Sequence, residues 1–317
     1  MGYKCGYKAS FGTSNTFSND ALEKSVLIGS GNTTYSDDGF AAGRGNVISG
    51  NYAPIALGYD NQALYSYATA IGKGNIVNGS QASMAMGYEC TSNNTNSIAI
   101  GEGNICGETG PSTNGRAAFA AGRVNTLNAS YGFTSGYGHS VSGASTGTSA
   151  LGLLNIADEN SYCSTLLGYG AKSSRYGEIV HAATAFSATG DAQICHILSK
   201  NQTTDAVETE LFTNGSDKRI TIPANTNATF SVLIIARQTN GAGEGGSYKL
   251  EGAISNEGGT TSLIGSVTKT VLAEDVAAWD VAATADDVND ALKLTGTGAA
   301  SDNVNWVAYT TLVQTTG

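Results

Sequence analysis

The stretch SIAIGEGN, Ser97 to Asn104, decides the fold, because its frame recurs throughout the first half of the chain. An apolar strand of large and small residues runs into a Gly, and an Asn follows three residues later. The aligned glycines are 14 to 16 residues apart, with one gap of 21. A phosphate-binding loop is needed once per site, so a motif in about eleven copies indicates architecture. The aligned positions are Gly29, Gly43, Gly58, Gly72, Gly87, Gly101, Gly122, Gly136, Gly152 and Gly168, with a weaker copy at Gly12.

This repeat length predicts one coil of a parallel β-solenoid, in which strands and tight turns alternate. It is too short for a βαβ unit, which needs roughly 30 residues. In SIAIG, Ile98 and Ile100 point to one face and Ala99 to the other. We expect the large face to fill the coil and the small face to admit a neighbouring chain. Alanines such as Ala56 and Ala85 would then pack tightly, inside a coil or at the axis of a trimer.

Two further residue types in the motif have a predicted role at the corner of the coil. The Gly would supply a positive φ or a close approach of two backbones. The Asn would tolerate the left-handed region and hydrogen-bond the turn.

The composition is that of a turn-rich β protein with little charge. Gly accounts for 42 of the 317 residues, charged residues for 13%, and the net charge is −10. Neither half clusters positive charge, so we expect no nucleic acid as a partner. No hydrophobic run approaches a transmembrane length and the N-terminus lacks an apolar signal region, so we expect no membrane insertion.

The second half of the chain has a different pattern. The repeat stops after Tyr176, and residues 191–317 contain roughly nine alternating runs separated by Gly, Asn and Asp. Such runs are typical of an antiparallel β-sandwich or jelly roll, with Trp279 and Trp306 in its core. The predicted fold is all-β: a β-roll shaft of about eleven coils over residues 1–176, a connector over 177–190 and a sandwich over 191–317.

The sequence pattern of the repeats over roughly residues 9–175 resembles the head repeats of trimeric autotransporter adhesins, the YadA-like heads. In that family the repeats form left-handed parallel β-rolls with three chains to a head, and they also occur in fibres of tailed phages. The adhesins carry a signal peptide, a coiled-coil stalk and a membrane anchor, and their absence here favours the phage side.

The second half resembles a C-terminal domain that recurs in phage and prophage tail-fibre-like proteins. The matching stretches are GDAQ (190–193), TTDAVETELF (203–212), RITIPANT (219–226), TVLAEDVAAWDV (270–281) and NWVA (305–308). This resemblance implies a virion or tail-fibre context and no particular chemistry.

Together these features predict a homotrimeric phage tail-fibre or receptor-binding protein, located in the virion after assembly in the host cytoplasm. It would bind a host-surface glycan or protein and contact other tail or baseplate proteins. We expect binding without catalysis and without a cofactor, because no carboxylate pair for sugar hydrolysis stands out. The alternatives are a purely structural virion protein, such as a head fibre or decoration protein, or a bacterial surface adhesin.

Two features of the repeats are candidate receptor-binding sites. Four tyrosines share the slot after the aligned Gly, and they form either a stacked ladder that stiffens one edge or an exposed strip for a saccharide. The gap of 21 residues contains an insertion, Ile105–Arg116, which we expect to leave the coil as a loop. The candidate residues are Tyr59, Tyr88, Tyr137, Tyr169, Glu108, Thr109, Ser112 and Asn114.

No residue pattern predicts a metal site or a disulfide framework. The five cysteines form no CxxC pair, and the three histidines are isolated. Asp286, Asp287 and Asp290 lack the spacing of a calcium loop, so a solvated acidic turn is the favoured interpretation.

Overall fold

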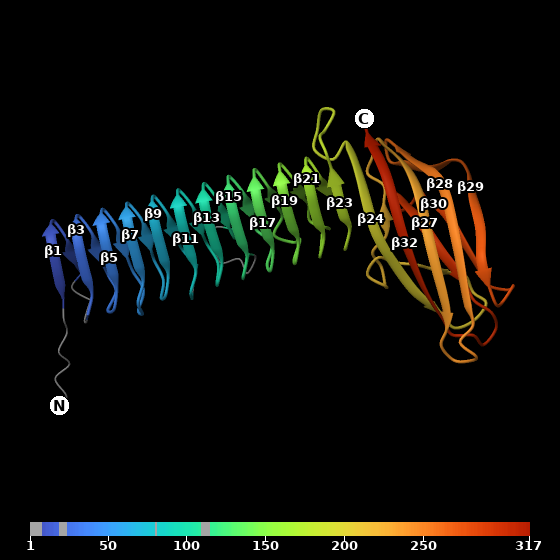
Figure 1. Cartoon of the computed structure of the whole chain (residues 1–317), viewed down its shortest axis with the longest axis horizontal. Coiled ribbons are helices and arrows are strands. Elements are labelled where there is room, and N and C mark those ends of the chain that lie inside the picture. The colour runs from blue at the N-terminus through green and yellow to red at the C-terminus, as the bar shows by residue number, and fades with distance from the viewer. Residues whose placement is uncertain (1–7, 19–23, 80, 109–114) are drawn as a thin grey trace. The chain divides into compact units, whose positions relative to one another are not determined.

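The computed structural model describes residues 8–18, 24–79, 81–108 and 115–317, and these residues form strands, turns and loops without a helix (Figure 1). The chain is all-β, with a parallel β-solenoid of about 11 turns followed by antiparallel strands. It divides into two compact units: the first ends at Leu154 and the second begins at Asn155. The described part of the chain contains no helix long and apolar enough to cross a membrane.

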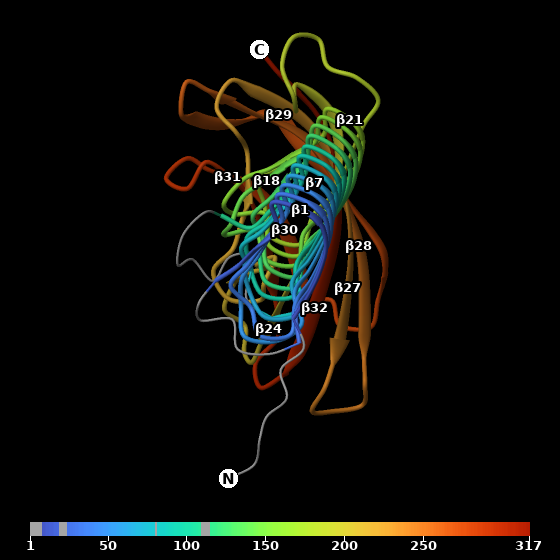
Figure 2. The ribbon, with the colours of Figure 1, turned by 90° about the vertical axis from the view of Figure 1, so that its left-hand side faces the viewer.

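Each coil of the first unit combines a strand of five residues with a strand of two. Each strand pairs in parallel with its equivalent in the next coil, as Ile55 does with Thr69 and Thr69 with Met84. Figure 2 shows these coils stacked one behind another. The long strands are β1 (Ala9–Thr13), β3 (Val26–Ser30), β5 (Phe40–Arg44), β7 (Ile55–Tyr59), β9 (Thr69–Lys73), β11 (Met84–Tyr88), β13 (Ile98–Glu102), β15 (Phe119–Arg123), β17 (Phe133–Tyr137) and β19 (Ser149–Leu153). The short strands are β2 (Thr16–Phe17), β4 (Thr33–Thr34), β6 (Val47–Ile48), β8 (Gln62–Ala63), β10 (Ile76–Val77), β12 (Thr91–Ser92), β14 (Ile105–Cys106), β16 (Thr126–Leu127) and β18 (Ser140–Val141).

The interior of each coil is narrow and holds the small face of the long strand. Ala56, Ala85 and Ala99 are fully buried, whereas the large residues on either side of them are only partly covered. The expectation that the large face fills the coil is therefore wrong. Alanine fits because the short strand opposite contributes bulk, such as Ile48 and Leu127, which are fully buried.

The large residues at the first and third positions of the long strands form two outward-facing rows, here called the outer rows. Parallel register aligns each residue with its equivalent in the next coil. The first-position row is Ala9, Val26, Phe40, Ile55, Thr69, Met84, Ile98, Phe119, Phe133 and Ser149. The third-position row is Phe11, Ile28, Ala42, Leu57, Ile71, Met86, Ile100, Ala121, Ser135 and Leu151.

The aligned Gly is required because consecutive coils touch at that point. At Gly58 the φ angle is +119°, and a Cβ would lie 2.0 Å from the carbonyl oxygen of Gly72. Both predicted reasons for Gly are confirmed at this position. The aligned Asn does not occupy the left-handed region; the residue before it does, as in Asp60 with φ 52°. Asn61 is instead fully buried inside the coil.

The insertion does not interrupt the parallel ladder. Ile98 in β13 pairs with Phe119 in β15, and Ile105 in β14 pairs with Thr126 in β16. Residues 109–114 lie outside the described residues.

The second unit begins with further coil strands and continues as two antiparallel sheets. The coil strands are β20 (Ile156–Ala157), β21 (Thr165–Tyr169), β22 (Lys172–Ser173) and β23 (Ile179–Ala182). The large sheet contains β24 (Ala192–Thr203), β32 (Val304–Thr316), β27 (Thr226–Gln238), β28 (Gly245–Glu257) and β29 (Thr260–Glu274) in that order, and β23 pairs with β24. The small sheet contains β25 (Thr209–Glu210), β26 (Ile220–Thr221), β30 (Asp280–Asp286) and β31 (Ala291–Thr297).

The two sheets of the second unit share one apolar core. Trp306 of β32 is fully buried, and its ring contacts Trp279 edge-on with centroids 5.9 Å apart. A Cβ on Gly296 of β31 would lie 2.7 Å from the Trp306 ring, so β31 packs directly over it. Both tryptophans are therefore core residues, as expected from the sequence. The domain boundaries at 176 and 190 stay a prediction.

Candidate binding surface

The fifth position of the long strands, directly after the aligned Gly, forms an exposed row of alternating charge and aromatic character. In consecutive coils this position holds Arg44, Tyr59, Lys73 and Tyr88, which are paired in register. Each of these side chains is exposed. The row continues through Glu102, Arg123 and Tyr137. We call these seven residues the cation–aromatic row.

Cations lie over the tyrosine rings within this row. The Arg44 guanidinium lies 5.6 Å from the Tyr59 ring centroid. The Lys73 ammonium lies 5.8 Å from the Tyr59 centroid and 5.3 Å from the Tyr88 centroid. These distances fall within the range of cation–π attraction, which holds the basic groups and the rings in a fixed alternation. Tyr59 and Tyr88 are thus separated by a cation and do not stack on one another.

The part of the row that follows Tyr88 contains an acidic residue, Glu102. Arg123 lies 5.8 Å from the Tyr137 ring and pairs with Glu102, with an Nε–Oε2 distance of 3.2 Å. Both charged side chains are more than 40% exposed, so water screens this ion pair. The hydrogen bond to Glu89 raises the pKa of the Tyr88 hydroxyl, so the Tyr88 side chain stays uncharged. In the segment from Arg44 to Tyr88 the row itself holds two cations, while the exposed acids Asp60 and Glu89 directly follow its two tyrosines.

This segment can contact an extended anionic ligand. Consecutive strands of a sheet are about 4.8 Å apart, which is comparable to the length of one sugar ring in an extended glycan. Exposed rings offer flat apolar surfaces, and Lys and Arg form charge-assisted hydrogen bonds with carboxylates. An ordered alternation of the two suits a polymer of acidic sugars better than a compact ligand.

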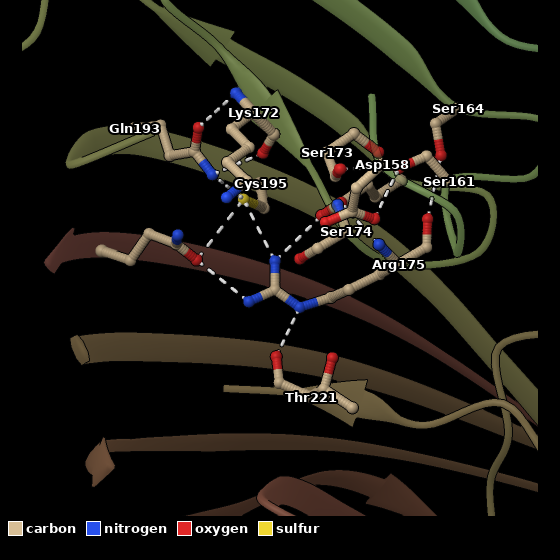
Figure 3. Close-up of polar contacts among 12 residues, drawn as sticks. Asp158, Ser161, Ser164, Lys172, Ser173, Ser174, Arg175, Gln193, Cys195 and Thr221 are labelled. Carbon is tan, nitrogen blue, oxygen red and sulfur yellow. Dashed lines mark hydrogen bonds and ion pairs between the residues drawn. The ribbon is translucent and has the colours of Figure 1, made fainter. Parts of the chain in front are cut away.

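A buried arginine, Arg175, hydrogen-bonds several polar groups of the second unit (Figure 3). The Arg175 guanidinium contacts Glu178 at 2.9 Å, and both side chains are fully buried. It also donates to the carbonyl of Thr221 at 2.6 Å and to Gln314 at 3.1 Å. Cys195 lies 3.5 Å from the same guanidinium, and burial raises the pKa of its thiol to about 12. Since Arg175 bonds to groups from β24, β26, β32 and the turn before β23, it acts as a structural link.

Beside this link lies a cavity of about 270 Å³ that contains two carboxyl groups with opposite pKa shifts. Burial raises the pKa of Asp158. Backbone N–H groups of Ala188, Ser187 and Phe186 hydrogen-bond Asp191 and lower its pKa. Lys172 and Gln193 also line the cavity, and the Gln193 side-chain oxygen accepts from the Lys172 backbone N–H at 2.9 Å.

The structure brings only part of the predicted site residues together. Tyr59, Tyr88 and Tyr137 lie in the cation–aromatic row, and Tyr169 is exposed at the fifth position of β21 in the second unit. Glu108 is half-buried after β14. Thr109, Ser112 and Asn114 lie outside the described residues.

Arg44, Lys73 and Arg123 were missed by sequence reasoning that followed tyrosines alone. The signal that identifies them is the same alignment slot, since each directly follows an aligned Gly. Within the described ranges, no group of three or more potential ligands could hold a metal ion.

Comparison with protein-family models finds no match, and no curated protein matches the chain. Among solved structures, the chain is similar to the tailspike protein gp49 of Acinetobacter baumannii bacteriophage Fri1, a capsular polysaccharide depolymerase. The identity is 10%, the TM-score is 0.25, and the alignment covers 92% of this chain and 63% of that one. The tailspike protein of A. baumannii phage AM24 matches at 8% identity and a TM-score of 0.21, over 96% of this chain and 56% of that one. The chain thus spans less than two thirds of the length of either tailspike.

These comparisons correct one expectation from the sequence. The expectation that the chain is not an enzyme is overturned, because the Fri1 tailspike is described as a depolymerase. The structural neighbours are phage tailspikes and the chain is a β-solenoid, whereas the relation to YadA-like heads stays a prediction.

Proposed function

We propose that this chain is a phage tail protein that attaches the virion to an anionic polysaccharide on the host surface. The observation that carries the proposal is the alternation of Arg44, Tyr59, Lys73 and Tyr88 at successive coils. A chain with a net charge of −10 would repel a polyanion unless its cations were gathered at the contact. The proposal includes assembly as a homotrimer and contact with other tail or baseplate proteins.

The test compares acidic and neutral polysaccharides. The triple variant Tyr59→Ala, Lys73→Ala and Tyr88→Ala is expected to lose binding to an acidic capsular polysaccharide measured by biolayer interferometry. The matched control removes Tyr52 and Tyr67, an exposed ring pair with centroids 6.0 Å apart that lies outside the row. The control should bind as the parent does, and parent binding should weaken as salt rises. Equal binding by parent and triple variant would exclude the row. Failure of the parent to bind any host polysaccharide would instead favour a purely structural virion component.

A second candidate function is cleavage of a polysaccharide in the cavity of the second unit. It is favoured by two carboxyl groups in one cavity whose pKa values shift in opposite directions: burial raises that of Asp158, and backbone N–H groups lower that of Asp191, which are the directions expected of an acid and its ionised partner. Asp158→Asn should abolish release of reducing ends and leave polysaccharide binding intact. The control is Asp217→Asn, in a surface turn where Asp217 bonds Asn214. Release that persists in Asp158→Asn would discard this candidate.

A further inference from the structure

The cation–aromatic row repeats its chemistry at every second coil. Arg44 and Lys73 stand two coils apart, with Tyr59 between them. Tyr88 follows Lys73 after one more coil. Two strand spacings amount to roughly 10 Å, which is comparable to the length of two sugar units in an extended glycan. A polymer that runs along the row would therefore meet a cation at one sugar and a ring at the next.

The position directly after the row, here called the corner slot, repeats with the same period. Gly45 and Gly74 follow the two cations, whereas the exposed acids Asp60 and Glu89 follow the two tyrosines. Gly45 leaves room for the acid of the next coil, because an added Cβ there would lie 2.1 Å from the Asp60 Oδ1. Glu89 accepts a hydrogen bond from the Tyr88 hydroxyl, so its carboxylate lies at the polar end of that ring. Each pair of coils thus presents one cation and one acid.

The backbone does not require acids in the corner slot. Asp60 and Glu89 have φ angles of 52° and 51°, in the left-handed region where Gly is least strained. Gly45 and Gly74 hold the equivalent positions with φ angles of 68° and 67°. The stack alone would favour Gly in all four coils. The alternation of Gly with an acid is therefore a property of the surface and has to be explained by what the surface contacts.

The alternating segment has two defined ends. The row position before Arg44 holds an uncharged residue, Ser30. The row position after Tyr88 holds Glu102 where the next cation would stand, and Glu102 pairs with Arg123. The alternation therefore extends over four coils, a length that accommodates about four sugars, or two repeats of a disaccharide.

This arrangement distinguishes acidic polymers by the spacing of their charges. A carboxylate on every second sugar can meet Arg44 and then Lys73, while the sugar between them covers the Tyr59 ring. A carboxylate on every sugar would also place charge over the tyrosine coils, close to Asp60 and Glu89. Two like unit charges about 4 Å apart in water repel each other by an amount worth about fivefold in affinity. The polymer with the higher charge would therefore bind less tightly.

We propose that the ligand of the cation–aromatic row is an acidic polysaccharide with one carboxylate for every two sugars, bound along the stack of coils. This inference rests on the attachment function proposed above and names the substrate class of the same site. Each carboxylate accepts charge-assisted hydrogen bonds from Arg44 or Lys73. Each uncharged sugar lies on a tyrosine ring, and its hydroxyl or amide hydrogens donate to the acid in the corner slot.

Three oligosaccharides of equal length test the spacing by biolayer interferometry. Hyaluronan oligosaccharides carry a carboxylate on every second sugar, oligogalacturonate carries one on every sugar, and chitin oligosaccharides carry none. The parent chain should bind the hyaluronan oligosaccharide at least about fivefold more tightly than oligogalacturonate, although oligogalacturonate has more charge. The chitin oligosaccharide should bind more weakly than the hyaluronan oligosaccharide, because it offers the cations no carboxylate.

Removal of the two acids should abolish the preference. Asp60→Asn with Glu89→Gln keeps hydrogen-bond acceptors in the corner slot and removes their charge. Oligogalacturonate should then bind at least about fivefold more tightly than it binds the parent, and the hyaluronan oligosaccharide should gain less. The control is Asp37→Asn with Asp38→Asn, which changes the net charge equally at the opposite end of β5 from Arg44. It should keep the preference of the parent.

The outcomes separate this inference from the function on which it rests. A parent that binds the acidic capsular polysaccharide without preferring hyaluronan over oligogalacturonate would overturn the spacing and leave attachment standing. A double variant with the parent's preference would also overturn the inference, since the preference would then arise away from Asp60 and Glu89. A parent that binds neither the capsular polysaccharide nor either acidic oligosaccharide would overturn both proposals.

Discussion

Asn61 and Asn75 are hydrogen-bonded to one another across consecutive coils. The Asn61 Oδ1 accepts from the Asn75 side chain at 2.9 Å and from its backbone N–H at 3.1 Å. The Asn61 amide also donates to the carbonyls of Leu57 at 3.0 Å and Gly72 at 2.7 Å. The same arrangement recurs between Asn46 and Asn61. The Asn residues of the motif thus form an internal hydrogen-bond ladder that joins consecutive coils.

Replacing Asn61 should therefore destabilise the solenoid strongly. Asn61→Ala removes the amide donor from two carbonyls and the acceptor from the Asn75 backbone N–H, and each such loss costs about 1–3 kcal/mol. We expect a decrease of about 3 kcal/mol in the free energy of unfolding, measured by urea denaturation. The control is Asn51→Ala, whose exposed side chain lies outside the ladder. A decrease below about 1 kcal/mol for Asn61→Ala would show that water replaces the ladder.

The ladder has a natural interruption whose repair should stabilise the protein. Cys90 occupies the Asn position, and its backbone N–H donates to the Asn75 Oδ1 at 3.0 Å. Its sulfur is a weaker acceptor toward the next coil than an amide oxygen. Cys90→Asn should raise the midpoint of thermal unfolding. One added hydrogen bond usually contributes about 1 kcal/mol to the free energy of unfolding. A lowered midpoint would show that the buried position fits the Cys90 side chain better than an Asn side chain.

The Gly at the coil corner should tolerate no side chain. Gly58→Ala would place a Cβ 2.0 Å from a backbone oxygen that cannot move without breaking the stack. We expect a loss of at least about 2 kcal/mol, because overpacking and a strained φ add together. Gly258→Ala is a fair comparison, since Gly258 also has a positive φ but an added Cβ there would meet nothing within 4 Å. Similar urea midpoints for the two variants would contradict the close approach.

His139 makes the solenoid sensitive to acid. It also occupies the Asn position, and burial lowers its pKa from 6.5. The unfolded chain then binds a proton at a higher pH than the folded chain, so stability falls as pH drops below about 6.5 and is fully present above it. His139→Asn should remove this contribution. Urea midpoints at pH 7.5 and 5.5 should differ more in the parent than in the variant. Equal pH dependence would assign the acid sensitivity to carboxyl groups instead.

The sequence predicts the solenoid well because each coil repeats the same short-range pattern. It does not predict which face of the strand lies inside, since Ile98 and Ala99 alternate equally well in either orientation. That choice depends on the opposing short strand, whose two residues are too few to give a pattern. Only part of the cation–aromatic row could be predicted from the sequence. Tyr59 and Tyr88 stand out in the alignment of the repeats, whereas the role of Lys73 depends on its coil lying between theirs.

The position of Lys73 between two rings leads to the last prediction, which separates charge from aromatic contact. Lys73→Met keeps the aliphatic stem beside Tyr59 and Tyr88 and removes the ammonium, while Lys73→Arg keeps the charge. If a carboxylate of the ligand meets Lys73, the Met variant loses a charge-assisted hydrogen bond of about 1.5–3 kcal/mol, or at least about tenfold in affinity. Binding of the acidic polysaccharide by Lys73→Arg should stay within about threefold of the parent, because about 0.6 kcal/mol is the scale of such an exchange. Titration in rising salt should show a shallower dependence for Lys73→Met, since one ionic contact fewer is screened. Unchanged affinity and salt dependence in Lys73→Met would show that the ligand meets the rings without the cation.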